Sequence, residues 1–180
     1  MTAALYVLGA PGVGKSTFVK AYLQANAWTA LPEPTRLHRT LIGHYLADRT
    51  GEVTGVYLGK HRQQFPGTDA LSMAVAPDAR VWARNLEPWL GFIVGEGQRL
   101  GNAGFLRALG ENTELTVVLL VADEAVLDAR CEERGSAQAP GWRRGAAKGA
   151  ANAFRDAQQY ASAVVVLDAN QPTAELVSVL

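Results

Sequence analysis

Gly9-Ala-Pro-Gly-Val-Gly-Lys-Ser-Thr17 follows a short apolar run, Leu5-Tyr-Val-Leu8, near the start of this chain of 180 residues. The stretch fits the pattern G-x-x-x-x-G-K-[ST] at every defined position. The apolar run predicts a buried strand, and apolar side chains at helical spacing predict a helix over residues 16–26. A glycine-rich turn between a strand and a helix is the context in which this pattern forms a phosphate-binding loop.

Each defined position of this loop has a chemical reason. Glycines at positions 12 and 14 let backbone N–H groups converge on a phosphate, and the start of the helix adds the positive end of its dipole. Lys15 places a charge on the β- and γ-phosphates, and the Ser16 hydroxyl is a Mg²⁺ ligand. The sequence therefore predicts that ATP binds here with Mg²⁺. The residues expected to bind it are Gly9, Pro11, Gly12, Val13, Gly14, Lys15, Ser16 and Thr17.

Composition narrows the class of protein. Seventeen basic residues balance seventeen acidic ones, and 48% of the chain is hydrophobic, which is typical of a soluble globular protein. The neutral balance does not favour binding to duplex DNA or to a membrane. No apolar run approaches the roughly 20 residues that span a bilayer. The single cysteine, Cys131, cannot form an internal disulfide, which fits a cytoplasmic location, and the length predicts one domain over residues 1–180.

Apolar runs and helical spacing predict the remaining elements. The expected strands are 28–31, 89–94, 115–121 and 163–167. The expected helices are 35–48, 70–86, 100–109, 123–133, 147–161 and 173–180, with a loop at 50–69. This alternation predicts an α/β fold with about five parallel strands and helices on both faces of the sheet. Functional side chains should then gather just after the strand ends.

The phosphate-binding loop and this layout resemble the P-loop kinases, in particular the group of nucleoside and nucleotide kinases that includes thymidylate kinases and deoxynucleoside kinases. The resemblance implies the three-layer α/β/α P-loop NTPase fold. It also implies transfer of the γ-phosphate of ATP to a small acceptor, most simply a nucleoside or nucleotide. Members of the group carry an arginine-rich lid, which the resemblance places at about residues 130–148.

The lid is expected to neutralise charge on the transferring phosphoryl group. Arg130 and Arg134 lie one turn apart on the predicted helix and are candidates for this role, although the lid of the group has no fixed spacing that would single out one arginine. Three further basic residues follow in the same segment: Arg143, Arg144 and Lys148. Asn170 follows the last predicted strand, where the backbone of relatives borders the adenine ring.

Two acidic residues follow predicted strands on the acceptor side, which we expect to span about residues 33–86. Glu33 precedes Pro34 after the second strand, where the resemblance places a glutamate close to an acceptor hydroxyl. Glu96 follows the third strand and would act on Mg²⁺ or on the acceptor, with Arg99 on a phosphate. Further residues expected to bind the acceptor are Arg36, Arg62, Phe65 and Asp69.

The acceptor remains open at this point. A hydroxyl acceptor needs a carboxylate base, which Glu33 could supply, whereas a monophosphate needs arginine clamps, for which Arg36 and Arg62 are candidates. A kinase of a hydroxymethylated base in DNA, of the kind that some phages encode, is a third interpretation. Kinases of antibiotics or sugar acids, and an NTPase or switch without an acceptor, are others. A homodimer is as compatible with the sequence as a monomer.

Overall fold

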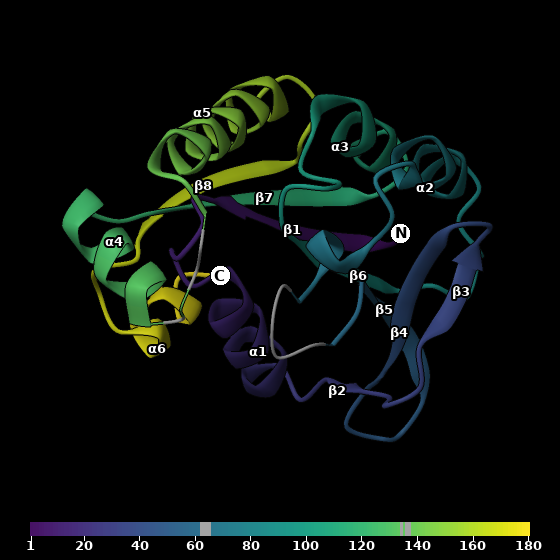
Figure 1. The fold of residues 1–180 in the computed structure, drawn as a ribbon. Helices are drawn as coiled ribbons and strands as arrows, with labels where there is room; N and C mark the ends of the chain where they lie inside the picture. The colour runs from purple at the N-terminus through teal and green to yellow at the C-terminus, as the bar shows by residue number, and fades with distance from the viewer. Residues whose placement is uncertain (62–65, 134, 136–137) are drawn as a thin grey trace.

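The computed structural model describes residues 1–61, 66–133, 135 and 138–180, which form one sheet between two layers of helices (Figure 1). The strands are β1 (Ala3–Gly9), β2 (Thr29–Ala30), β3 (Thr35–His38), β4 (Leu41–Ala47), β5 (Val53–Leu58), β6 (Phe92–Glu96), β7 (Glu114–Val121) and β8 (Ala163–Asp168). The helices are α1 (Lys15–Ala25), the 3-10 helix η1 (Thr68–Ala70), α2 (Val75–Arg84), α3 (Ala103–Gly110), α4 (Glu124–Glu133), α5 (Pro140–Ala157) and α6 (Thr173–Val177).

The sheet has a parallel centre and a mixed edge. Its strand order is β2-β4-β5-β6-β1-β7-β8, and β3 pairs with the outer side of β4. Strands β5, β6, β1, β7 and β8 all run parallel, and β4 runs antiparallel to its three neighbours. The predicted α/β fold with about five parallel strands is therefore confirmed. The phosphate-binding loop lies at the carboxyl edge of the central strand, where ligands bind in open α/β sheets.

Alternate residues of β1 point into the two cores. Tyr6 and Leu8 pack in the core with α2, α3 and α5, whereas Leu5 and Val7 pack in the core with α1 and α6. These helices cover the two faces of the sheet (Figure 1). A strand covered on both faces is apolar throughout, which is why β1 is recognisable from its sequence alone. Within the described residues, none of the helices is long and apolar enough to cross a membrane.

The predicted helix over 35–48 is wrong. These residues form the β3–β4 hairpin, which turns at Arg39, a residue with a φ of 34°. Strand β4 is buried on both faces, so its apolar residues do not alternate and their spacing imitates that of a helix. Gly43 belongs to this packing, because a Cβ there would lie 2.7 Å from the carbonyl oxygen of Tyr57 on β5.

The predicted loop over 50–69 is also wrong in part, because it contains β5 and η1. Gly55 makes the segment resemble a loop, but in β5 it allows close packing. A Cβ at Gly55 would lie 3.1 Å from Cβ of Leu46 and 3.2 Å from the carbonyl oxygen of Phe92. This correction matters for function, because β5 and not β2 is the parallel neighbour of β6.

Candidate active site

The phosphate-binding loop connects β1 to α1, as predicted. Gly12 and Gly14 have φ values of 82° and 98°, in the left-handed region that favours glycine. A Cβ at Gly12 would also lie 2.9 Å from Sγ of Cys131 and 3.1 Å from the carbonyl oxygen of Leu127. Helix α4 therefore packs directly against the loop, and glycine at position 12 is required by both the backbone and this contact.

Lys15 begins α1 and lies inside the loop. Its Nζ atom donates hydrogen bonds to the carbonyl oxygens of Gly9, at 3.1 Å, and Ala10, at 3.0 Å. The side chain is largely buried, so its charge acts in a region from which much of the water is excluded. A buried ammonium group at the N-terminus of a helix matches what the oxygens of a phosphate chain require.

Glu96 ends β6 beside the loop. Parallel pairing of β1 with β6 sets Val7 opposite Glu96, which brings the carboxylate to the start of α1. There Ser16 donates a hydrogen bond from Oγ to Oε1 of Glu96 at 2.6 Å, and the Tyr57 hydroxyl donates to the same oxygen at 3.4 Å. The side chain is only 2% exposed. The predicted pair of metal ligands, Ser16 and Glu96, is therefore brought into direct contact.

The environment of Glu96 shifts its pKa. Burial raises this pKa above the usual range of a glutamate, and the hydrogen bond from Ser16 and the charge of Lys15 act in the opposite direction. Asp69 adds a smaller repulsion that also raises the pKa. A buried carboxylate with a raised pKa next to a lysine and a glycine-rich loop is characteristic of a functional site.

The oxygen atoms of Ser16 and Glu96 suit Mg²⁺, which prefers hard oxygen ligands. Among the described residues, no group of three or more His, Cys, Asp or Glu side chains could hold a metal ion by itself. Mg²⁺ in kinases is held by one or two protein ligands together with the phosphates of the substrate. The pair present here fits that pattern.

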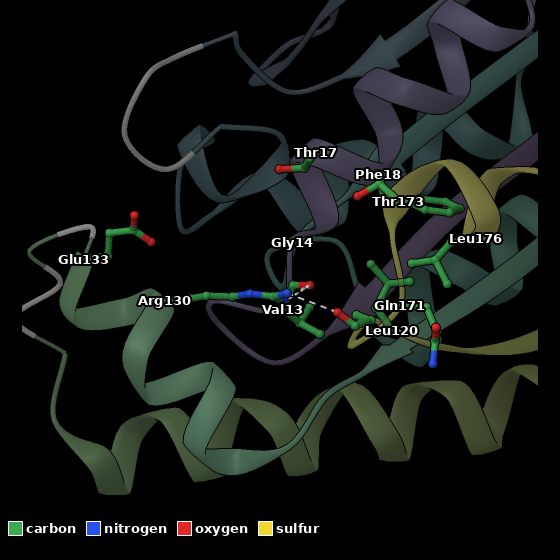
Figure 2. A pocket seen from close by; sticks show the side chains of 11 residues that line it. Val13, Gly14, Thr17, Phe18, Leu120, Arg130, Glu133, Gln171, Thr173 and Leu176 are labelled. Carbon is green, nitrogen blue, oxygen red and sulfur yellow. Dashed lines mark hydrogen bonds between the residues drawn. The ribbon is translucent and has the colours of Figure 1, made fainter.

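A cavity of about 240 Å³ opens on the α4 and α6 side of the loop (Figure 2). It is lined by Val13, Gly14, Thr17, Phe18, Leu120, Arg130, Glu133, Ala169, Gln171, Thr173 and Leu176. Arg130 reaches across it from α4 and donates to the carbonyl oxygens of Val13, at 3.4 Å, and Ala169, at 3.1 Å. This arginine therefore connects the phosphate-binding loop to the segment after β8.

Asn170 lies beside this cavity, between two of its lining residues. Its Oδ1 atom accepts a hydrogen bond from the backbone N–H of Asp123 at 3.3 Å. The side chain thereby ties the loop after β8 to the loop after β7. Asn170 itself is absent from the described lining, whereas its neighbours Ala169 and Gln171 line the cavity.

The remaining residues of the predicted lid lie on α4, on α5 or between them. Arg143 pairs with Asp128, at 2.7 Å between Nη1 and Oδ1, and so joins the two helices. Arg144 and Lys148 are exposed on α5. Arg134 lies outside the described residues. Of the described lid cations, Arg130 is the one that lines the cavity.

The acceptor side differs from the arrangement that the resemblance implied. Glu33 is exposed in the bend between β2 and β3, at the edge of the sheet. Strands β4 and β5 separate β2 from β6, so Glu33 does not follow the strand next to Glu96. The expected position of Glu33, beside the active site at the end of a central strand, is therefore corrected. Arg36 is exposed on β3, and Arg62 and Phe65 lie outside the described residues.

Asp69 and Arg99 meet in the loop that follows Glu96. Oδ1 of Asp69 accepts hydrogen bonds from the backbone N–H groups of Gln98, at 2.8 Å, and Arg99, at 3.1 Å. Asp69 thus holds this loop in place. The Nε atom of Arg99 is buried, and within the described part of the chain it has no hydrogen-bond partner.

Sequence reasoning missed two residues that position Glu96. Thr68 donates from Oγ1 to the backbone carbonyl of Glu96 at 2.8 Å, and the Tyr6 hydroxyl donates to the carbonyl of Gly97 at 3.0 Å. The two hydroxyl groups also contact each other, at 3.1 Å. A tyrosine inside an apolar strand was the available signal, since a buried tyrosine hydroxyl needs a partner.

Comparisons with known proteins support the fold and identify the family. A search of curated proteins finds no match. Among solved structures, the chain is similar to an unliganded sugar kinase from Janibacter sp. HTCC2649, with 14% sequence identity and a TM-score of 0.52. That match covers 99% of this chain and 91% of the other, and at this identity it shows the fold. The family model described as P-loop Nucleotide Kinase3 matches residues 1–178, and the chain therefore belongs to this family of P-loop kinases.

Proposed function

We propose that this kinase uses ATP and Mg²⁺ to phosphorylate a small acceptor of the nucleoside or nucleotide class. The observation that carries the proposal is the 2.6 Å contact between Ser16 and Glu96 at the phosphate-binding loop. A hydroxyl and a carboxylate held together beside a buried lysine can bind Mg²⁺ and phosphate oxygens at one point. The family description, which names a nucleotide kinase, supports the acceptor class.

Backbone and side-chain groups of the loop and its neighbours would bind different parts of ATP and its metal ion. The backbone amides around Gly12 and Gly14 and the Lys15 ammonium would hold the phosphates, and Ser16 and Glu96 would hold the metal. When bound, Mg²⁺ supplies positive charge that offsets the negative charge on the transferring phosphoryl group. The adenosine would occupy the cavity beside Arg130, where Phe18 and Leu176 offer apolar contacts and Gln171 offers a polar one.

Glu96 also serves the acceptor. A hydroxyl group must lose its proton as its oxygen bonds to phosphorus, and a carboxylate within reach can take that proton. Glu96 contacts the phosphate-binding loop, whereas Glu33 lies at the sheet edge. We therefore assign the proton to Glu96 and keep Glu33 as the alternative that substitution will test.

The proposal is tested by measuring ADP formation with and without acceptors. The panel contains nucleosides, nucleoside monophosphates, sugars and DNA that carries hydroxymethylated bases, each with labelled ATP and Mg²⁺. We expect ADP release to accelerate with one class of small molecule and label to appear on that molecule. ADP release that proceeds at full rate without an acceptor would support an NTPase instead. Label transferred to DNA alone would show that the acceptor is modified DNA and not a small molecule.

Substituting Arg130 tests the nucleotide cavity. Arg130→Ala removes a cation that lines this cavity and both hydrogen bonds that connect its walls. A charged hydrogen bond from Arg130 to a phosphate oxygen of ATP would contribute about 1.5–3 kcal/mol, so its loss should raise KM for ATP about tenfold or more. Arg84→Ala is the matched control, since Arg84 is exposed at the end of α2. The measurement is steady-state kinetics with varied ATP. A wild-type KM for ATP in both variants would contradict the placement of the nucleotide in this cavity.

A further inference from the structure

Tyr57 on β5 lies beside the carboxylate of Glu96, on the α1 side of the sheet. The parallel pairing of β5 with β6 sets Tyr57 opposite Val94. Both side chains pack in the core with α1, and because side chains alternate along a strand, Glu96 points to the same face as Val94. The Tyr57 hydroxyl can therefore reach Oε1 of Glu96, to which it donates a hydrogen bond at 3.4 Å.

Two hydroxyl groups donate to that one oxygen atom. Ser16 donates to Oε1 of Glu96 at 2.6 Å, but as a proposed Mg²⁺ ligand it must also turn its oxygen toward the metal ion. Tyr57 is only 3% exposed and lies outside the phosphate-binding loop. It is not one of the proposed ligands. Its hydroxyl group can therefore hold the carboxylate in one orientation while Ser16 serves the metal ion.

The ring of His61 limits the movement of the Tyr57 side chain in turn. The two rings are stacked, with centroids 4.7 Å apart and planes at 19° to each other. The backbone N–H of His61 donates to Nε2 of His44 at 3.4 Å. The preceding residue, Lys60, exchanges two backbone hydrogen bonds with Gly67, at 3.0 and 3.1 Å. His61 is thus fixed through its backbone, and its ring is fixed against Tyr57.

The hydrogen bonds of His44 suit it to this contact with His61. His44 is buried on β4, and its Nδ1 atom lies 2.8 Å from the carbonyl oxygen of Leu31. A carbonyl oxygen can only accept, so Nδ1 carries the proton of this bond and Nε2 is left to accept from the backbone of His61. A buried side chain with both nitrogen atoms in use gives His61 a fixed support.

We propose that Tyr57 is a positioning residue for the proposed magnesium site: its hydroxyl group keeps the Glu96 carboxylate turned toward Ser16, and the stacked ring of His61 keeps Tyr57 in place. The inference rests on the proposed function, in which Ser16 and Glu96 hold Mg²⁺. Tyr57 itself is assigned no contact with the metal ion or with ATP. Removing a group that hydrogen-bonds to a metal ligand typically lowers metal affinity or activity by about 10–100-fold.

The test measures how much Mg²⁺ strengthens the binding of a non-hydrolysable ATP analogue. Calorimetric titration gives the Kd of the analogue with EDTA and with saturating Mg²⁺, both without an acceptor. The ratio of these two constants, here called the magnesium ratio, compares variants by what the protein adds to metal binding, since the free analogue is the same for all of them. Tyr57→Phe removes the hydroxyl and keeps the ring. It should lower the magnesium ratio about tenfold or more and leave the Kd with EDTA within about twofold.

Tyr22→Phe is the matched control, because it removes a tyrosine hydroxyl elsewhere in the same core. Tyr22 is half-buried on α1, where its ring stacks with those of Phe18 and Phe92. This variant should keep the wild-type magnesium ratio. An unchanged ratio in Tyr57→Phe would overturn the inference and leave the proposed function intact, as would an equal loss of affinity with Mg²⁺ and with EDTA. A wild-type protein whose binding of the analogue is not strengthened by Mg²⁺ would contradict the proposed function and the inference together.

Two variants at His61 test the role of the stacked ring. His61 is exposed, so these variants should fold even if Tyr57→Phe does not. His61→Ala removes the ring, and the contribution of a stacked aromatic pair predicts a fall in the magnesium ratio of about two- to tenfold. His61→Phe keeps a flat ring and should restore the wild-type ratio. An unchanged ratio in His61→Ala, or no recovery in His61→Phe, would reject the role assigned to this ring.

Discussion

Lys15→Met is expected to lower kcat/KM for phosphoryl transfer by about 10²–10³, the loss typical of removing one group that stabilises charge in a transition state. The Lys15 ammonium is held inside the phosphate-binding loop by the carbonyl oxygens of Gly9 and Ala10, where phosphate oxygens are expected. Methionine keeps the length and apolar character of the side chain and removes the charge. The measurement is the transfer of labelled phosphate from ATP to the acceptor, with the acceptor at a saturating concentration.

Two controls separate this effect from damage to the fold. The far-ultraviolet circular dichroism spectrum of Lys15→Met should match that of the wild type. Lys20→Met removes a lysine charge elsewhere on the same helix, where Lys20 is exposed, and should leave the activity unchanged. Removal of the Lys15 charge should also raise the pKa of Glu96 further, because that charge now lowers it. Activity of Lys15→Met near the wild-type level would remove the assignment of this loop as the site of phosphoryl transfer.

Glu96→Gln is expected to lower kcat by about 10²–10⁴, since it removes both the proposed metal ligand and the proposed base. Glutamine has nearly the same shape, and its carbonyl oxygen can still accept the hydrogen bonds that Ser16 and Tyr57 now donate. Glu33→Gln is the discriminating comparison and should retain most of the activity. A large loss of kcat in Glu33→Gln, with little loss in Glu96→Gln, would identify Glu33 as the base instead.

The pH dependence provides a second readout of Glu96. Its raised pKa means that the ionised form becomes dominant only above the usual pH range for a glutamate. The acid limb of kcat/KM should therefore lie above that range. For stability the sign is opposite: the folded protein holds this proton more tightly than the unfolded chain, so the contribution is greatest at low pH and is lost as pH rises through the raised pKa. Glu96→Gln should accordingly unfold at no lower temperature than the wild type at neutral pH.

The β3–β4 hairpin and β5 show where sequence patterns fail in this protein. In both segments the strands are packed closely by neighbours on the sheet, so apolar residues and glycines occur without alternation. Local spacing then cannot separate a strand from a helix or a loop, because what determines the choice is contact with residues far along the chain. Glu33 lies at the sheet edge and not beside Glu96 for the same reason, since β4 and β5 stand between β2 and β6.

The sequence alone predicts the parts of the active site that depend on local chemistry. The phosphate-binding loop needs only glycines, a lysine and a serine at fixed spacing between a strand and a helix, and the structure has all of them in that context. The parallel sheet and its two layers of helices also follow from the alternation of elements. Family membership over residues 1–178 agrees with both.

Tertiary structure alone decided which of the two candidate carboxylates, Glu33 or Glu96, meets the phosphate-binding loop. Glu96 contacts Ser16, which lies 80 positions away in the chain, because β6 pairs with β1. Sequence spacing thus determined the phosphate chemistry, whereas strand order and helix packing determined the site around it, since these depend on contacts between distant segments.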